Sequence, residues 1–308
     1  MTDRRAPALD QILDGLMSRY RANVPDVDGI VRAMIAEGIV GSDRDIENDH
    51  IAFRTMGVPH LGVGSLEKVF LRHGYMKRDR FDFPAKKLDA WWYEPPAPAY
   101  PRIFISQLRV GDLSERTAEI IRSYTGEVGG DPVNLLDLGN PDEVIDFLHR
   151  PLWRTPTWGD YSALLAESEY AAWVIYTRYY LNHFTITIHN LPAGYDPIAG
   201  FNAFLERRGF KLNDSGGTIK VSHDGKLLQS STVAAMVEAA FDDRRGGEER
   251  HQISGSYVEF AERRVLDQFA DLPPDQVRRE HRRDGFEADN ADRIFESTYT
   301  DQTRKRMG

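Results

Sequence analysis

The chain has 308 residues, of which 41% are hydrophobic and 28% charged, and its formal net charge is −9. This composition is ordinary for a soluble globular protein of one large or two small domains, and the acidic balance argues against nucleic acid as a partner. Because the chain has no cysteine, disulfides, iron–sulfur clusters, thiolate metal sites and cysteine nucleophiles are excluded.

Taken from the N-terminus, the sequence leads us to expect a cytoplasmic protein. Residues 1–8 are charged and short of apolar side chains, unlike a secretory signal peptide. No apolar stretch approaches the ~20 residues that span a bilayer, so we expect no membrane partner. The absence of cysteine fits a reducing compartment.

Residues 1–47 predict helices that lead into the core. Apolar side chains recur at helical spacing over 9–39, and Pro25 separates two runs. Residues 48–110 then predict a first module that begins with a strand. Its expected elements are a strand over 49–56, a helix over 66–73 ended by Gly74, and strands over 75–83, 88–93 and 102–110.

Residues 111–180 predict a helical insertion, with helices over 114–123, 141–148 and 161–179. Residues 181–263 predict a second module, whose later strands are 218–222, 227–231 and 256–261 and in which 243–250 is a polar loop. Residues 264–308 form a charged tail that we expect to be helical in pieces. We expect residues 1–308 to form a single catalytic domain.

The two modules repeat one order of elements. His50 leads a β-rich run, a loop and a short amphipathic helix that ends at Gly74, and His183 leads the same order, which ends at Gly209. From histidine to glycine is 24 residues in the first copy and 26 in the second. The repeat therefore predicts one histidine at the same structural position of two related modules.

Strand alternation predicts which side chains converge. His50 and Arg54 share one face of the first strand, opposite an apolar face, because side chains two and four residues apart point the same way. His183 leads an equally regular alternation, and Glu259 lies inside an apolar run of the last strand. Two histidines and one carboxylate on a shared face are the usual ligands of a non-haem Fe(II) site with open positions. We therefore predict a metal site of His50, His183 and Glu259.

Other interpretations compete with each of these residues. A single strand histidine is more often structural than a metal ligand, and only the repeat raises the two above that rate. Arg54 has the alternative of an ion pair with Asp49 or Glu47, and His189 is a reserve ligand that we expect at the rim.

The last strands of the two modules suggest which residues correspond. Aligning Ser106-Gln107-Leu108 with Val258-Glu259-Phe260 makes Gln107 the repeat partner of Glu259. On that alignment the first copy keeps a neutral amide, so the site has three protein ligands rather than four.

The chain resembles a known family, the 2-oxoadipate dioxygenase/decarboxylases or hydroxyglutarate synthases of the vicinal oxygen chelate superfamily. The resemblance runs from about 49 to 299, is closest to the short members, and rests on Asp49-His50-Ile51-Ala52-Phe53-Arg54-Thr55, Asn182-His183-Phe184-Thr185 and Tyr257-Val258-Glu259-Phe260-Ala261-Glu262-Arg263. It implies an α+β fold with paired βαβββ modules around a barrel-like site, N-terminal helices and an inserted helical segment.

The resemblance also implies an activity and a role for each site residue. It implies Fe(II) held by His50, His183 and Glu259, with Arg54 holding the distal carboxylate of a 2-oxo dicarboxylic acid. The implied reaction is that of lysine catabolism, in which 2-oxoadipate and O2 give 2-hydroxyglutarate and CO2. Because affinity does not select iron, another divalent ion can occupy such a site.

Two other functions stay open on the same residues. One is a different metal enzyme of the superfamily, an extradiol-type dioxygenase, a lyase or an isomerase, because fold does not fix function. The other is a metal-free protein that binds a small acid in the cavity. Oxygen uptake that depends on a 2-oxo acid separates the first from the prediction, and metal analysis separates the second.

Overall fold

The computed structural model describes residues 6–307. Its main feature is an eight-stranded sheet in the order β2-β3-β4-β1-β5-β10-β7-β6. The first half of this sheet comprises β1 (Asn48–Gly57), α3 (Val63–Arg72), β2 (Met76–Phe83), β3 (Leu88–Glu94) and β4 (Arg102–Arg109). The second half comprises β5 (Leu181–Thr187), α8 (Ile198–Arg207), β6 (Lys220–Val221), β7 (Leu227–Ser231) and β10 (Tyr257–Arg263).

The two halves have the same strand pairing. In the first half β1 pairs parallel with β4, and β4 continues antiparallel to β3 and then β2. In the second half β5 pairs parallel with β10, and β10 continues antiparallel to β7 and then β6. The halves join through the antiparallel pair β1 and β5. The α+β class and the paired βαβββ modules are therefore confirmed.

One face of the central strands is packed against helices. Ile51 and Phe53 on β1 and Ile186 on β5 are buried in the main hydrophobic cluster. The helix α7 contacts β1, and α2 and α8 contact β10. Burying each such side chain contributes about 1.5–3 kcal/mol, which fixes the register and turns the opposite, polar face toward the site.

The helices outside the modules lie mostly where the sequence predicts them. Pro25 separates α1 (Pro7–Asn23) from α2 (Pro25–Ala36), and the insertion contains α4 (Glu115–Thr125), α5 (Pro141–His149), α6 (Trp158–Glu167) and α7 (Glu169–Thr177). The single helix expected over 161–179 is wrong. Ser168 is extended and its side chain accepts a hydrogen bond from the Ala171 amide, so it ends α6 and caps α7.

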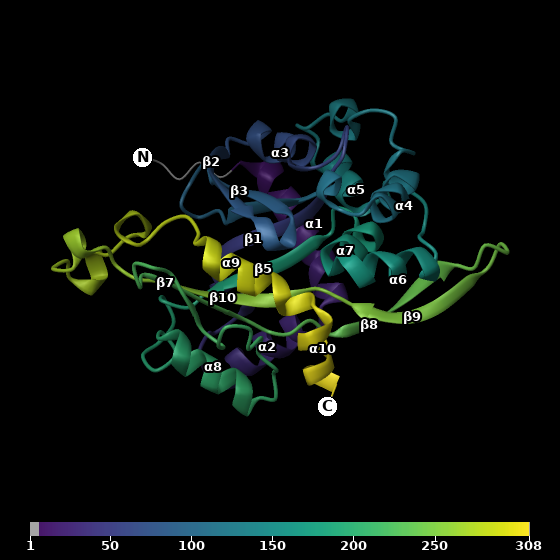
Figure 1. Ribbon diagram of the computed structural model, residues 1–308. Helices are drawn as coiled ribbons and strands as arrows, with labels where there is room; N and C mark the ends of the chain where they lie inside the picture. Colours follow the sequence, from purple (N-terminus) through teal and green to yellow (C-terminus); the bar gives the residue numbers. More distant parts are fainter. Residues whose placement is uncertain (1–5, 308) are drawn as a thin grey trace.

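A second sheet was not predicted. The strands β8 (Met236–Asp242) and β9 (Glu248–Ser254) form a hairpin that projects from the body of the molecule (Figure 1). The polar loop expected over 243–250 is therefore only the hairpin turn, and its last residues belong to β9. The sequence did not predict β9, because most of its residues are polar and face solvent rather than a core.

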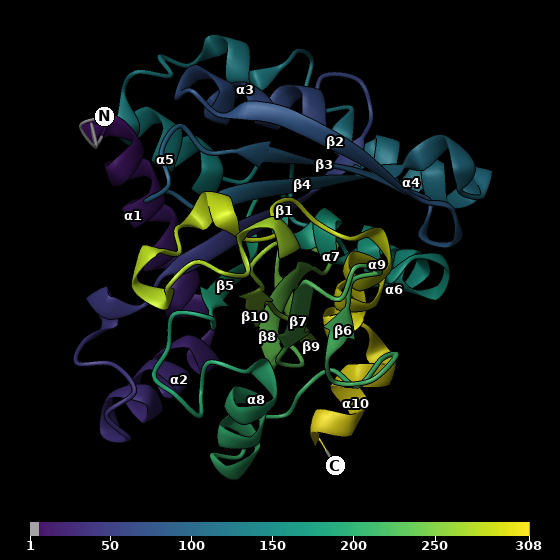
Figure 2. The ribbon, with the colours of Figure 1, turned by 90° about the vertical axis from the view of Figure 1, so that its left-hand side faces the viewer.

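The C-terminal tail is helical in pieces, as expected, but it is also part of the core. The helix α9 (Ala288–Phe295) contacts β2 of the first half and β6 and β7 of the second, and α10 (Thr300–Met307) follows it. Figure 2 shows α9 between the strands of the two halves. The tail therefore crosses the polar face of the sheet.

Short 3-10 turns complete the described chain: η1 (Asp43–Asp45), η2 (Pro84–Lys86), η3 (Val110–Asp112), η4 (Pro132–Leu135), η5 (Asp267–Phe269), η6 (Pro274–Gln276), η7 (Arg279–His281) and η8 (Glu296–Thr298). Within residues 6–307 no helix has both the length and the apolar character needed to cross a membrane.

Candidate metal centre

Three buried side chains converge where the two halves of the sheet meet. The Nε2 atoms of His50 and His183 are 3.4 Å apart, and Glu259 places its carboxylate oxygens 3.5 Å from the first and 3.1 Å from the second. Each of the three residues is at most 6% exposed. The structure thus brings together the three predicted ligands from β1, β5 and β10.

The separations suit one divalent ion. Nitrogen and oxygen ligands about 2.1 Å from an ion lie roughly 3.0 Å apart at right angles and roughly 3.4 Å apart at a tetrahedral angle. The observed separations fall around this range, and the three ligand atoms lie within 4.8 Å of one another. Two imidazoles and one carboxylate on one side of an ion leave other positions for substrate and oxygen.

Each histidine is oriented by the residue that precedes it. The Nδ1 of His50 lies 2.8 Å from an Asp49 carboxylate oxygen, and the Nδ1 of His183 lies 3.1 Å from the side-chain oxygen of Asn182. A proton on Nδ1 donates to each of these oxygens, which leaves the Nε2 lone pair free for a metal. The sequence contains this signal in both copies, because an Asp or Asn directly precedes each histidine.

Asp49 belongs to a buried network of charges. It accepts from Arg263 Nε at 2.6 Å and from a terminal nitrogen of Arg263 at 2.9 Å, and Arg102 lies 3.3 Å away. Burial by itself would raise the pKa of Asp49, but the two guanidinium groups lower it well below its usual value. Asp49 is therefore a charged acceptor for His50.

Glu259 is also held by a second layer of side chains. The Gln229 amide donates to Glu259 Oε1 at 2.6 Å, and Asn290 of α9 donates to the Gln229 oxygen at 3.0 Å. All three residues are buried. The amides hold one carboxylate oxygen, and the other lies closest to His183. The tail thus helps to orient Glu259.

The electrostatic environment separates the two histidines. Burial opposes charge on both rings, yet Glu259 and Asp49 raise the pKa of His50. His183 has only a neutral neighbour at Nδ1, and burial with the nearby His50 and Arg54 lowers its pKa well below the usual value. His183 is therefore neutral at physiological pH.

Aromatic and aliphatic side chains enclose the triad. Phe286 lies edge-on to His50 with ring centroids 4.8 Å apart, and Tyr257 lies against His183 at 4.9 Å. Phe104, Ile294 and Phe295 complete much of the wall, and the space that remains measures about 20 Å³. That volume holds a small ion or a water molecule.

Arg54 is a buried cation beside this cavity. It is 1% exposed and donates to the Thr298 hydroxyl at 2.9 Å and the Phe295 carbonyl at 3.0 Å. Among residues 6–307 it has no carboxylate partner, so the predicted alternative of an ion pair with Asp49 or Glu47 is wrong. Its Nε has no hydrogen-bond partner in the described chain, and neither does the buried Tyr257 hydroxyl. Two donors therefore stand ready for an acceptor from outside the chain.

The register of the sheet corrects the proposed partner of Glu259. His50 lies opposite Arg102 on β4, and His183 lies opposite Tyr257 on β10. Two residues further on, Phe104 takes the position that Glu259 has in the second half. Gln107 is three residues beyond Phe104, and its side-chain oxygen accepts from the Val63 amide at 3.1 Å. The alignment of the two short strand sequences was therefore shifted by three residues. Only the pairing of β4 with β1 and of β10 with β5 fixes which residues correspond.

His189 is not a ligand of this site. Its Nδ1 accepts from the Arg263 amide at 3.1 Å. Burial, followed by the charge of Arg282, lowers its pKa to about 3. It is a neutral, structural histidine at the end of β5.

A family model described as 2-oxoadipate dioxygenase/decarboxylase matches residues 12–272. The chain is 43% identical to a relative from Oryza sativa subsp. japonica named 2-oxoadipate dioxygenase/decarboxylase, chloroplastic/amyloplastic, over 98% of this chain and 84% of that protein. It is 42% identical to a chloroplastic relative of the same name from Arabidopsis thaliana, over 86% of this chain and 72% of that protein.

A solved structure is similar over the whole fold. It is the crystal structure of the hydroxyglutarate synthase in complex with 2-oxoadipate from Oryza sativa, with a TM-score of 0.87 and 40% sequence identity. The match covers 98% of this chain and 96% of that chain.

The names of the two plant relatives contradict the expectation of a cytoplasmic protein, because they place those relatives in plastids. The expectation rested on the absence of cysteine and of an apolar leader. Neither absence distinguishes the cytoplasm from another reducing compartment, and an organelle transit peptide is not apolar.

Proposed function

The chain belongs to the 2-oxoadipate dioxygenase/decarboxylase family, and we propose that it converts 2-oxoadipate and O2 into 2-hydroxyglutarate and CO2. All atoms of the diacid and of dioxygen are accounted for in these two products. The observation that carries the proposal is the buried triad of His50, His183 and Glu259 beside an arginine that has no carboxylate partner in the described chain.

The triad is suited to hold Fe(II). His183 is neutral, His50 presents Nε2, and Glu259 supplies the single negative charge, which is the ligand set of many non-haem iron oxygenases. Iron bound there would transfer electrons from the 2-oxo acid, which is the species oxidised overall, to dioxygen. Asp49, Asn182 and Gln229 keep the three ligands in place through the hydrogen bonds described above.

Arg54 and Tyr257 are suited to hold the far end of the substrate. Arg54 lies on the strand that carries His50, four residues further on, and donates to the carbonyl of Phe295, which lines the cavity beside the triad. Its unused Nε and the unused Tyr257 hydroxyl both donate, and a carboxylate accepts. We propose that this pair selects a dicarboxylate over a monocarboxylate.

The small size of the cavity requires movement during turnover. A six-carbon diacid does not fit a space of about 20 Å³. The segment from Phe286 to Phe295 forms one wall, so its displacement is the smallest change that admits substrate. Once it returns, the aromatic side chains exclude bulk water from the reacting groups.

We further propose that residues 1–308 act as one catalytic unit, since both halves and the tail contribute to one site. A role in lysine catabolism stays a prediction, because it concerns the supply of the substrate rather than the site.

The direct test is an aerobic assay of Fe(II)-loaded protein with 2-oxoadipate. The amounts of O2 consumed, CO2 released and 2-hydroxyglutarate formed should be equal. A Glu259→Gln variant, matched in size, should form no product. Product formation without oxygen uptake would point instead to a lyase or isomerase, and binding without turnover would point to a protein that only sequesters the acid.

A further inference from the structure

A second and larger cavity lies away from the triad. It measures about 330 Å³ and is lined by the end of α1, the end of α7, the start of β5 and the β8–β9 hairpin. It shares no lining residue with the cavity around the triad. Its volume is in the range of pockets that bind small molecules.

Two arginines give this pocket a positive wall. Arg178 is 7% exposed and donates to the carbonyls of Tyr176, Trp153 and Arg154 at 2.6, 2.8 and 3.0 Å. Arg19 lies flat over the Tyr180 ring, 3.8 Å from its centroid, and donates to the His149 carbonyl. Among residues 6–307, neither guanidinium has a carboxylate partner.

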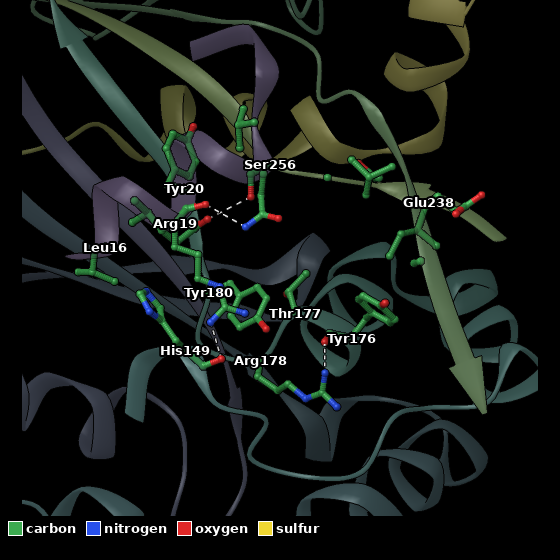
Figure 3. A pocket seen from close by; sticks show the side chains of 18 of the residues that line it. Leu16, Arg19, Tyr20, His149, Tyr176, Thr177, Arg178, Tyr180, Glu238 and Ser256 are labelled. Atoms are coloured by element: carbon green, nitrogen blue, oxygen red, sulfur yellow. Dashed lines mark hydrogen bonds between the residues drawn. The ribbon is translucent and has the colours of Figure 1, made fainter. Parts of the chain in front are cut away.

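The lining contains one carboxylate, and it lies apart from these arginines. Glu238 is more than half exposed and pairs with Arg250 at 2.5 Å. Figure 3 shows Arg19 beside His149 and Tyr180, and Glu238 on the opposite side of the view. The charge of Glu238 is thus already paired, and the wall formed by Arg19 and Arg178 keeps its positive charge.

Buried polar atoms around this cavity also lack partners. The Nε of Arg178, the Nε2 of His149 and the hydroxyl of Ser254 have no hydrogen-bond partner in the described chain. Most buried polar atoms in proteins are satisfied, so three unsatisfied atoms on residues that line one cavity point to a partner from outside the chain. Arg178 also has φ 57°, which is rare for a residue with a side chain, and such strain is common at functional sites.

The remaining wall is apolar and aromatic. Leu16, Val24, Val237 and Ile253 line it together with the rings of Tyr20 and Tyr176. A simple inorganic anion would leave these surfaces unused, whereas a short carbon chain would cover them.

We propose that this pocket is a second binding site, for a small organic acid whose carboxylate pairs with Arg19, next to the buried charge of Arg178. Its floor includes Leu181 and Ser256, two and three residues before the metal ligands His183 and Glu259. The site goes beyond the proposed reaction, since binding here needs neither metal nor turnover.

The test is calorimetric titration of the full chain with glutarate, a saturated diacid without the 2-oxo group. The protein carries Arg54→Gln, so that the distal-carboxylate site does not compete. We expect one glutarate per chain, and about tenfold weaker binding when Arg19→Gln is added. The matched control is Arg32→Gln, an exposed arginine on α2, which should leave the affinity unchanged.

Two further arms keep the result decisive. Ala239→Leu enlarges a buried side chain of the cavity lining and should abolish binding in protein that still unfolds cooperatively. Inorganic phosphate should bind at least about tenfold more weakly than glutarate, because it cannot use the apolar wall. Equal phosphate affinity, unchanged affinity in Arg19→Gln, or no glutarate binding up to about 10 mM would each overturn the proposal.

Discussion

The two halves of the sheet share one topology but hold their histidines differently. In the first half His50 donates a hydrogen bond to the carboxylate of Asp49, which two buried arginines keep charged. In the second half His183 donates a hydrogen bond to the neutral side-chain amide of Asn182. The side-chain nitrogen of Asn182 has no hydrogen-bond partner in the described chain. One support is therefore ionic and part of a network, and the other is a single hydrogen bond.

The same contrast appears at the next equivalent positions. Arg102 of the first half corresponds to Tyr257 of the second, and Phe104 corresponds to Glu259. The duplicated strands thus fix the positions of the side chains, whereas the chemistry of those side chains differs: at the second pair one half supplies an aromatic wall and the other the carboxylate of the triad. This asymmetry leaves three candidate ligands rather than four.

The largest expected difference between the halves concerns the residues that support the histidines. Asp49→Asn leaves Arg263 buried without its charge partner, which should cost about 3–5 kcal/mol of unfolding free energy and 10- to 100-fold in metal affinity, roughly. Asn182→Ala removes one neutral hydrogen bond and should cost about 1 kcal/mol. Denaturant unfolding and metal titration measure both. Equal losses in the two variants would show that the supports are equivalent.

Arg54 tests what the first half contributes to the substrate. Arg54→Ala should lower kcat/KM for 2-oxoadipate roughly 30-fold to several thousand-fold, because the distal carboxylate loses its charged partner. This corresponds to a loss of about 2–5 kcal/mol in transition-state stabilisation. Arg54→Lys should recover little, since a point charge does not replace the planar fork. Metal content and turnover of the monocarboxylate 2-oxohexanoate serve as controls. Near-normal turnover of 2-oxoadipate would make Arg54 a structural residue.

Tyr257 tests the contribution of the second half to the same end of the substrate. Tyr257→Phe should lower kcat/KM for 2-oxoadipate. The expected loss of transition-state stabilisation is about 1.5–3 kcal/mol, which is what a hydrogen bond to a charged group contributes. Its melting temperature should be unchanged or higher, because the buried hydroxyl has no partner in the described chain. A lower melting temperature with unchanged kinetics would assign the hydroxyl a purely structural role.

Gln107 is expected to show the smallest effect. A carboxylate at this position still accepts the Val63 amide, so Gln107→Glu should change stability by about 0.5 kcal/mol or less and leave metal content unaltered. Metal analysis and thermal melting check this. A change in metal stoichiometry would restore Gln107 as the counterpart of Glu259 and contradict the strand register.

The parts of the site that the sequence predicted are those that strand geometry alone decides. A strict period of two placed His50, His183 and Glu259 on inward faces, and the repeat indicated that the faces meet. The register between two strands depends on residues that are far apart in the sequence. A short strand sequence does not contain this information, so Gln107 was aligned with Glu259, although the structural counterpart is Phe104, three residues earlier.

The cover of the site was missed for a different reason. The tail is strongly charged, and its three buried apolar side chains, Phe286, Ile294 and Phe295, are spread over ten residues. That pattern is too sparse to predict a wall of a cavity. The β8–β9 hairpin escaped prediction similarly, because β9 exposes most of its side chains and so lacks a clear apolar alternation.

The most direct test of the shared site is anomalous diffraction at the iron edge, from crystals grown without oxygen and with Fe(II). The account predicts one peak per chain, at the seam between β1 and β5, within about 2.0–2.3 Å of His50 Nε2, His183 Nε2 and a Glu259 oxygen. No peak at that position in iron-loaded protein, or a peak held by only one half of the sheet, would contradict it.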